Sequence, residues 1–174
     1  SMTTLIILLY LAVLAFGLGL HFLNNRQLKM FGHQVPAGFE GAIDPTTLAK
    51  SSDYTLAKGQ VSLIQSLFDS GLTLWFIFGG LMVWYDSWLS GLNLGFISAG
   101  LGFFLLLSLA KSIIDLPFDL YNHFKVETRF GFNNMSFKLW CTDLLKSLVL
   151  STLLFALLAS AAFWLIQAAP DSWW

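Results

Sequence analysis

Three long stretches of this chain contain no Asp, Glu, Lys or Arg, and they constrain its fold more than any other feature. They cover residues 5–23, 92–110 and 147–169. A helix crosses the roughly 30 Å hydrocarbon layer of a bilayer with about 20 such residues, so each stretch predicts a transmembrane helix. A shorter uncharged stretch, residues 70–85, contains three glycines, which membrane helices tolerate. We therefore predict about four membrane spans.

The composition supports this interpretation. Hydrophobic residues make up 56% of the 174 residues and charged residues only 11%, against about 25% charged in soluble globular domains. A soluble core cannot hide that much apolar surface, which predicts an all-α polytopic membrane protein embedded in a lipid bilayer. The net charge of −1 offers no electrostatic basis for binding nucleic acid.

The positions of the basic side chains predict an orientation, because cytoplasmic loops of membrane proteins carry an excess of Lys and Arg. All nine lie between spans one and two or between and at the ends of spans three and four: Arg26, Lys29, Lys50, Lys58, Lys111, Lys125, Arg129, Lys138 and Lys146. The loops 24–69 and 115–146 are therefore expected to be cytoplasmic, and both termini non-cytoplasmic.

The segment from residue 24 to 65 is too polar to be predicted as a span. Within it, Asp44 followed by Pro45 is typical of a helix start, because Asp caps the free amides and Pro suits the first helical position. A short helix through residues 46–54 is expected there.

The segment 115–134 separates two apolar stretches but carries five charged groups. A helix from residue 92 to about 128 would be roughly 55 Å long, and one from about 135 to 168 roughly 50 Å. Both would extend well beyond the hydrocarbon layer, joined by residues 129–134. Gly131 is the expected helix C-cap and Asn133 or Asn134 the expected N-cap of the following helix.

Acidic groups and one imidazole recur every fourth residue in this segment, at Asp115, Asp119, His123 and Glu127. Pro117 would kink the helix or mark a fresh start capped by Asp115. The polar row either meets cytoplasmic water or lines a wet internal cavity. His123 and Glu127 could share a metal ion, but one straight helix cannot bring all four side chains to one metal. We predict no metal site in this chain.

The same segment resembles a known family. "LPFDLYNHFKVETRFGFNN" is similar to the L-P-x-x-L-Y-x-x-F-x-x-E-x-x-x-G-F-N signature of type I CAAX prenyl proteases, which are integral-membrane zinc metalloproteases. The matching residues are Leu116, Pro117, Leu120, Tyr121, Phe124, Glu127, Gly131, Phe132 and Asn133. The segment "KSSDYTLAK" resembles the family's K-x-x-x-Y-x-x-x-K stretch through Lys50, Tyr54 and Lys58. The similarity covers essentially the whole chain, but only the N-terminal membrane region of the family.

The zinc motif of the family is missing from this chain. Family members carry H-E-x-x-H on a later helix, where two His bind zinc and the Glu activates water. The three histidines here have no second His four residues on: His21 is followed by Asn25, His33 by Ala37 and His123 by Glu127. Residues 1–174 are therefore expected to form the N-terminal membrane domain of a longer protein and to be inactive alone.

The resemblance implies a ring of membrane helices around a hydrophilic chamber, with zinc bound by the full-length protein. It also implies a C-terminal metalloprotease half as a partner and membrane-associated proteins or peptides as substrates. The expected membrane is the endoplasmic reticulum in a eukaryote and the inner or plasma membrane in a bacterium.

Seven residues of the signature are candidate site residues. We expect Glu127 and Asn133 to be buried polar anchors that hold the 125–134 turn against the catalytic half. Tyr121 and Asn122 could touch a peptide, although an interface anchor is the favoured role for Tyr121. Pro117, Gly131 and Phe132 complete this set, which is predicted either to surround the zinc site without binding the metal or to lie at the interface between the domains. The alternative is a separate four-helix scaffold, chaperone or small transporter, which would not continue beyond residue 174 into H-E-x-x-H.

Overall fold

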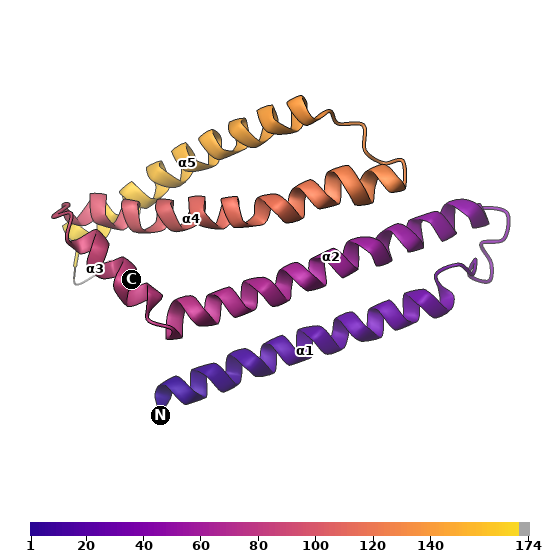
Figure 1. Cartoon of the computed structure of the whole chain (residues 1–174), viewed down its shortest axis with the longest axis horizontal. Coiled ribbons are helices and arrows are strands. Elements are labelled where there is room, and N and C mark those ends of the chain that lie inside the picture. The colour runs from indigo at the N-terminus through magenta and orange to yellow at the C-terminus, as the bar shows by residue number, and fades with distance from the viewer. Residues whose placement is uncertain (171–174) are drawn as a thin grey trace. The chain divides into compact units, whose positions relative to one another are not determined.

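The chain is almost entirely helical in the computed structural model, which describes residues 1–170 (Figure 1). The helices are α1 (Met2–Phe31), α2 (Pro45–Phe78), α3 (Leu81–Ser90), α4 (Phe96–Tyr121), the π-helix η1 (Asn122–Glu127) and α5 (Phe137–Ala168). In this part of the chain, four helices are long and apolar enough to cross a membrane: Met2–Phe31, Pro45–Phe78, Phe96–Glu127 and Phe137–Ala168. The predicted all-α fold with about four spans is confirmed.

α2 corrects the predicted separation between a short polar helix and the second span. The structure has one continuous helix of 34 residues from Pro45 to Phe78. It ends before residue 85 because Gly79 and Gly80 follow, and Gly80 adopts a left-handed conformation with φ of 84°. This conformation is unfavourable for residues with a Cβ atom. Residues 81–90 then form α3, so the prediction of a single span over 70–85 and a turn over 86–91 was wrong.

Asp44 caps α2 as predicted. Its carboxylate accepts hydrogen bonds from the Thr47 backbone N–H at 2.9 Å, from the Thr47 hydroxyl at 2.7 Å and from the Thr46 hydroxyl. The Thr46 hydroxyl contributes most to stabilising the ionised form. Together these donors lower the pKa of the Asp44 carboxyl from 3.8 to about 2. The cap therefore stabilises the helix start fully above pH 3.8, and its contribution is lost as the pH falls through 2.

We expect an NMR titration of the Asp44 carboxyl carbon to show a midpoint clearly below 3.8, because three donors favour the carboxylate. The double substitution Thr46→Val and Thr47→Val removes both hydroxyls but keeps the β-branched shape. It should move the midpoint back toward the ordinary value. A wild-type midpoint at the ordinary value would show that these hydrogen bonds do not form in solution.

The chain divides into two compact units. Unit 1 contains Ser1–Thr73 and Phe118–Asn133, and unit 2 contains Leu74–Pro117 with the segment that begins at Asn134. In unit 1, α1 and α2 lie side by side (Figure 1). They approach closely at Gly59, where an added Cβ would lie 3.4 Å from the His21 ring and 3.5 Å from the Asn25 amide oxygen. Near the connecting loop, the buried Ser52 hydroxyl donates to the Gly32 carbonyl.

In unit 2, α3 packs on α4 through two buried side chains. The Tyr85 hydroxyl donates to the Phe103 carbonyl at 2.7 Å, and the two rings lie 5.0 Å apart. Leu89 is only 4% exposed and faces Gly102. α5 packs on α4 through Phe163, whose ring covers Gly100 so closely that an added Cβ would lie 2.6 Å from it. Gly100 and Gly102 of α4 therefore leave room for large side chains from α5 and α3.

The two long helices around the signature were predicted well in length. α4 together with η1 runs from Phe96 to Glu127, and α5 runs from Phe137 to Ala168. Two details differ. Ser136 is the N-cap of α5, accepting from the Leu139 N–H at 3.3 Å, whereas Asn133 or Asn134 was expected.

Pro117 was predicted either to kink the helix or to mark a fresh start; it lies inside α4, so the second alternative is wrong. Asp115 does not cap a helix there; it forms an ion pair with Lys111 one turn earlier. Membrane helices tolerate an interior proline because other groups satisfy the backbone carbonyl that it leaves free.

Candidate functional site

The end of the third span is a π-helix, η1, covering Asn122–Glu127. A π-turn closes i→i+5 bonds and is frequent at functional sites. The four-residue spacing that aligns side chains on a regular α-helix does not hold across it. The predicted polar row therefore does not continue as one line: the His123 imidazole contacts the Asp119 carbonyl oxygen at 3.1 Å, whereas Glu127 contacts α2.

The two stretches that carry the family resemblance meet in unit 1 to form one site. We call it the motif cluster, and its members are Lys50, Tyr54 and Lys58 of α2 with Glu127, Phe130 and Phe132. Tyr54 lies at its centre, with its ring edge-on to Phe130 at 5.7 Å and to Phe132 at 4.8 Å between centroids. Such edge-to-face pairs are favourable because the positive ring edge meets the negative ring face.

Glu127 is the acidic member of the motif cluster. Its Oε1 atom accepts from the Tyr54 hydroxyl at 3.4 Å and lies 3.3 Å from Lys58 Nζ. The Glu127 side chain is 17% exposed and that of Lys58 is 46% exposed. A carboxylate with so little exposure needs partners to offset lost hydration, and α2 supplies both of them. The pair thus fixes where Glu127 lies more than it stabilises the fold, since half-exposed ion pairs contribute little.

Two cations lie over aromatic faces in the same cluster. Lys50 Nζ is 4.9 Å from the centre of the Phe132 ring, and Lys58 Nζ is 5.2 Å from that of Tyr54. Ammonium groups at this distance are attracted by the ring quadrupole. α2 therefore contacts the signature segment through every fourth residue of its K-x-x-x-Y-x-x-x-K stretch.

The turn after η1 is closed by its own hydrogen bonds. Gly131 has φ of 72°, a left-handed conformation that favours glycine, and the Phe132 N–H donates to the Glu127 carbonyl at 2.9 Å. The Asn133 amide donates to the Thr128 hydroxyl at 3.1 Å. Gly131 was predicted to be the helix C-cap, but η1 ends at Glu127 with Thr128 as its C-cap, and Gly131 lies in the turn that follows. Glu127 and Asn133 thus hold opposite ends of the same turn.

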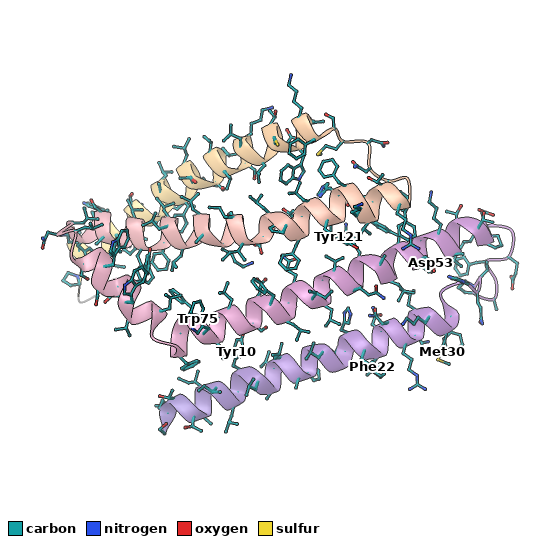
Figure 2. All side chains as sticks on the ribbon, viewed as in Figure 1. Tyr10, Phe22, Met30, Asp53, Trp75 and Tyr121 are labelled. Atoms are coloured by element: carbon teal, nitrogen blue, oxygen red, sulfur yellow. The ribbon has the colours of Figure 1, made fainter. Side chains whose placement is uncertain are left out.

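The remaining predicted site residues lie outside the motif cluster. Tyr121 is 54% exposed (Figure 2), and Pro117 is exposed as well. Asn122 is half-buried, and its side-chain oxygen is buried without a hydrogen-bond partner among the described residues. Their predicted role in an interface stays a prediction.

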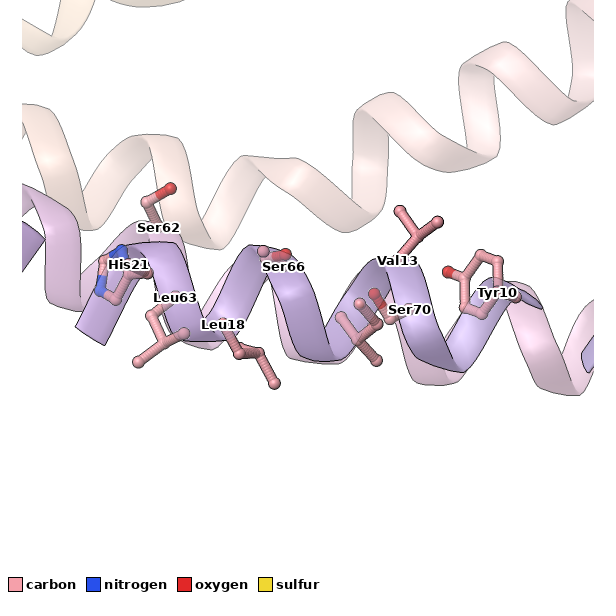
Figure 3. Close-up of a pocket in the computed structure, with 10 residues that line it drawn as sticks. Tyr10, Val13, Leu18, His21, Ser62, Leu63, Ser66 and Ser70 are labelled. Carbon is pink, nitrogen blue, oxygen red and sulfur yellow. The ribbon is translucent and has the colours of Figure 1, made fainter. Parts of the chain in front are cut away.

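A polar stripe along α2 was not predicted from the sequence. It consists of Ser62, Gln65, Ser66, Asp69, Ser70 and Thr73. Ser62, Ser66 and Ser70 line a groove of about 340 Å³ with Tyr10 and His21 of α1 (Figure 3). The signal was present in the sequence as polar residues spaced three and four apart, which share one helix face.

The described residues do not fit a zinc site. No group of three His, Cys, Asp or Glu side chains that could hold a metal exists within residues 1–170. His21 pairs with Asn25 and His33 with Asp53, both at 2.8 Å, in separate places.

Comparisons with known proteins agree with the geometry. Residues 24–174 match the family described as "CAAX prenyl protease N-terminal, five membrane helices". "CAAX prenyl protease 1" of Saccharomyces cerevisiae is 33% identical over 142 residues, covering 75% of this chain and 31% of that protein. The "CAAX prenyl protease 1 homolog" of Homo sapiens is 29% identical over 161 residues, covering 86% of this chain and 34% of that protein.

The fold also matches a solved structure. The crystal structure of S. mikatae Ste24p is similar with a TM-score of 0.82 and 28% identity, covering 94% of this chain and 39% of that one. The chain thus spans about a third of the length of the curated relatives that it matches. The resemblance read from the signature is confirmed, and the chain belongs to the CAAX prenyl protease family as an N-terminal membrane domain.

Proposed function

We propose that this chain is the N-terminal membrane half of a zinc metalloendopeptidase, in which it forms part of the chamber wall and positions the catalytic half. The observation that carries this proposal is the motif cluster, where both family motifs meet through aromatic packing and an ion pair. Side chains that converge in this way hold backbone in place. Zinc and the residues that use it would come from the remainder of the protein.

The segment being positioned is the turn after η1. Glu127 fixes its start through Tyr54 and Lys58, and Asn133 fixes its end through Thr128. Phe132 remains 47% exposed although it packs on Tyr54. The turn is thus held at both ends and exposes an aromatic side chain, which suits contact with a further protein segment. We assign that segment to the catalytic half.

The polar stripe on α2 is the evidence for the proposed role in the chamber wall. Polar side chains within a membrane-crossing helix face protein or a water-filled cavity, because contact with lipid is costly. The stripe follows α2 for three turns from Ser62 to Thr73. We infer that it faces the aqueous chamber, and that the basic motif cluster marks the cytoplasmic end of unit 1. The substrates in this proposal are membrane-associated proteins.

The test uses the full-length protein with Glu127→Gln and, separately, Asn133→Ala. Because small displacements of positioning groups can cost up to about a hundredfold in rate, we expect peptidase activity to fall by about tenfold or more in each variant. Zinc content, measured on the same samples, should be unchanged. Glu40→Gln, which neutralises a carboxylate outside the motif cluster, is the matched control and should keep full activity.

Two results would contradict the proposal. Unchanged proteolysis in both variants would show that the turn after η1 does not position the catalytic half. Loss of zinc together with activity would show that these residues act on the metal site itself.

A further inference from the structure

A groove of about 540 Å³ between α1 and α2 in unit 1 combines an apolar wall with a basic rim. Its apolar lining includes Leu18 and Phe22 of α1 and Leu63 and Leu67 of α2. Arg26 and Lys29 line it at one end, and Figure 2 shows Phe22 on the same helix. No acidic residue lines this groove in the described part of the chain. It is separate from the motif cluster.

The spacing of these residues explains the shape of the groove. Leu18, Phe22, Arg26 and Lys29 recur at intervals of four, four and three, so they follow one face of α1. Leu63 and Leu67 are four apart on α2 and form the facing wall. The rise from Leu18 to Lys29 is about 16 Å at 1.5 Å per residue. His21 and Asn25 also line the groove between these ends, and Met30 lines it beside Lys29. The cationic groups are therefore confined to one end of the groove.

We propose that this groove binds an anionic phospholipid, with an acyl chain along the leucines and the phosphate headgroup at Arg26 and Lys29. α1 is long and apolar enough to cross the membrane, which would place its uncharged part at the depth of acyl chains, and the basic residues follow where the uncharged stretch ends. Basic pockets beside membrane helices recognise anionic headgroups by charge complementarity. Arg adds bidentate hydrogen bonding to phosphate. The proposal requires neither the proposed peptidase activity nor a particular orientation of the chain.

The test is native mass spectrometry of the full-length protein in detergent micelles that contain equal amounts of phosphatidylglycerol and phosphatidylcholine. Wild type should retain more phosphatidylglycerol than phosphatidylcholine. The double variant R26Q and K29Q should weaken this binding by roughly thirtyfold, because each basic group near an anionic headgroup contributes a factor of about five. The double variant K138Q and K146Q removes the same charge from α5 and should bind as wild type does.

A second variant tests the groove itself. Leu63→Trp fills the apolar wall without changing charge, and it should lower retention of both lipids. Each variant is accompanied by a thermal unfolding scan to establish that it is folded. Equal retention of the two lipids by wild type, or full retention by R26Q and K29Q, would overturn the proposal. Retention of neither lipid by wild type would overturn it as well, since another part of the protein would then cover the groove.

Discussion

Replacing Tyr54 with alanine is expected to lower the free energy of unfolding of unit 1 by about 2 to 3 kcal/mol. Removing a fully buried aromatic ring costs about 3 to 5 kcal/mol, and because Tyr54 is only half-buried, the expected cost lies below that range. The ring contacts both Phe130 and Phe132, and its hydroxyl contacts Glu127. Loss of Tyr54 therefore releases the turn after η1 from α2.

The comparison variant is Tyr54→Phe, which keeps both ring contacts and removes only the hydroxyl. We expect it to cost about 0.5 to 1 kcal/mol, the net contribution of an ordinary hydrogen bond. Stability is measured by unfolding in mixed micelles of increasing denaturing detergent. Hydrogen exchange of the amides in residues 128–133 should accelerate in the alanine variant and change little in the phenylalanine variant. Equal effects of both variants would mean that the hydroxyl, rather than the aromatic packing, holds the turn.

Replacing Leu89 with alanine is expected to destabilise unit 2 by about 2 to 4 kcal/mol, because truncating a buried leucine loses its packing contacts and leaves a cavity. Leu89 is among the most buried side chains described, and it faces Gly102 of α4. The matched control is Leu153→Ala on α5, where the side chain is 64% exposed. The same truncation there should change the free energy of unfolding by less than about 0.5 kcal/mol.

The measurement is again the unfolding midpoint in mixed micelles. Near-ultraviolet circular dichroism of the aromatic cluster around Tyr85 serves as a second observation. We expect the Leu89 variant to lose part of this signal while its helical content stays the same. If Leu89→Ala and Leu153→Ala shifted the midpoint equally, α3 would not be packed on α4 as the structure shows.

The free-energy contributions of the individual contacts indicate how the motif cluster is held together. The Lys58–Glu127 pair joins groups that are 46% and 17% exposed, and an ion pair with this exposure contributes at most about 1 kcal/mol. Each aromatic pair around Tyr54 contributes about 0.5 to 1.5 kcal/mol beyond the burial of its surface. Packing therefore supplies most of the stability, and the charges determine which way Glu127 points.

Several elements were predictable from the sequence because their causes are local. The uncharged stretches predict spans through the cost of placing charge in hydrocarbon. Asp44 before Pro45 predicts the start of α2, and Gly131 predicts the turn after η1 through its tolerance of positive φ. The N-cap of α5 was predicted at Asn133 or Asn134 but lies at Ser136, because several residues in that loop can cap and the preceding turn determines which one is in place.

The membrane character of this chain and its family follow from composition, spacing and nine matched signature positions, which can be read without a structure. The continuity of α2 and the π-turn of η1 became visible only in the folded chain. The same holds for the contact between Tyr54 and Glu127, which are 73 residues apart. Local propensity cannot predict such a contact, because it depends on how separate helices pack and on which faces they bury.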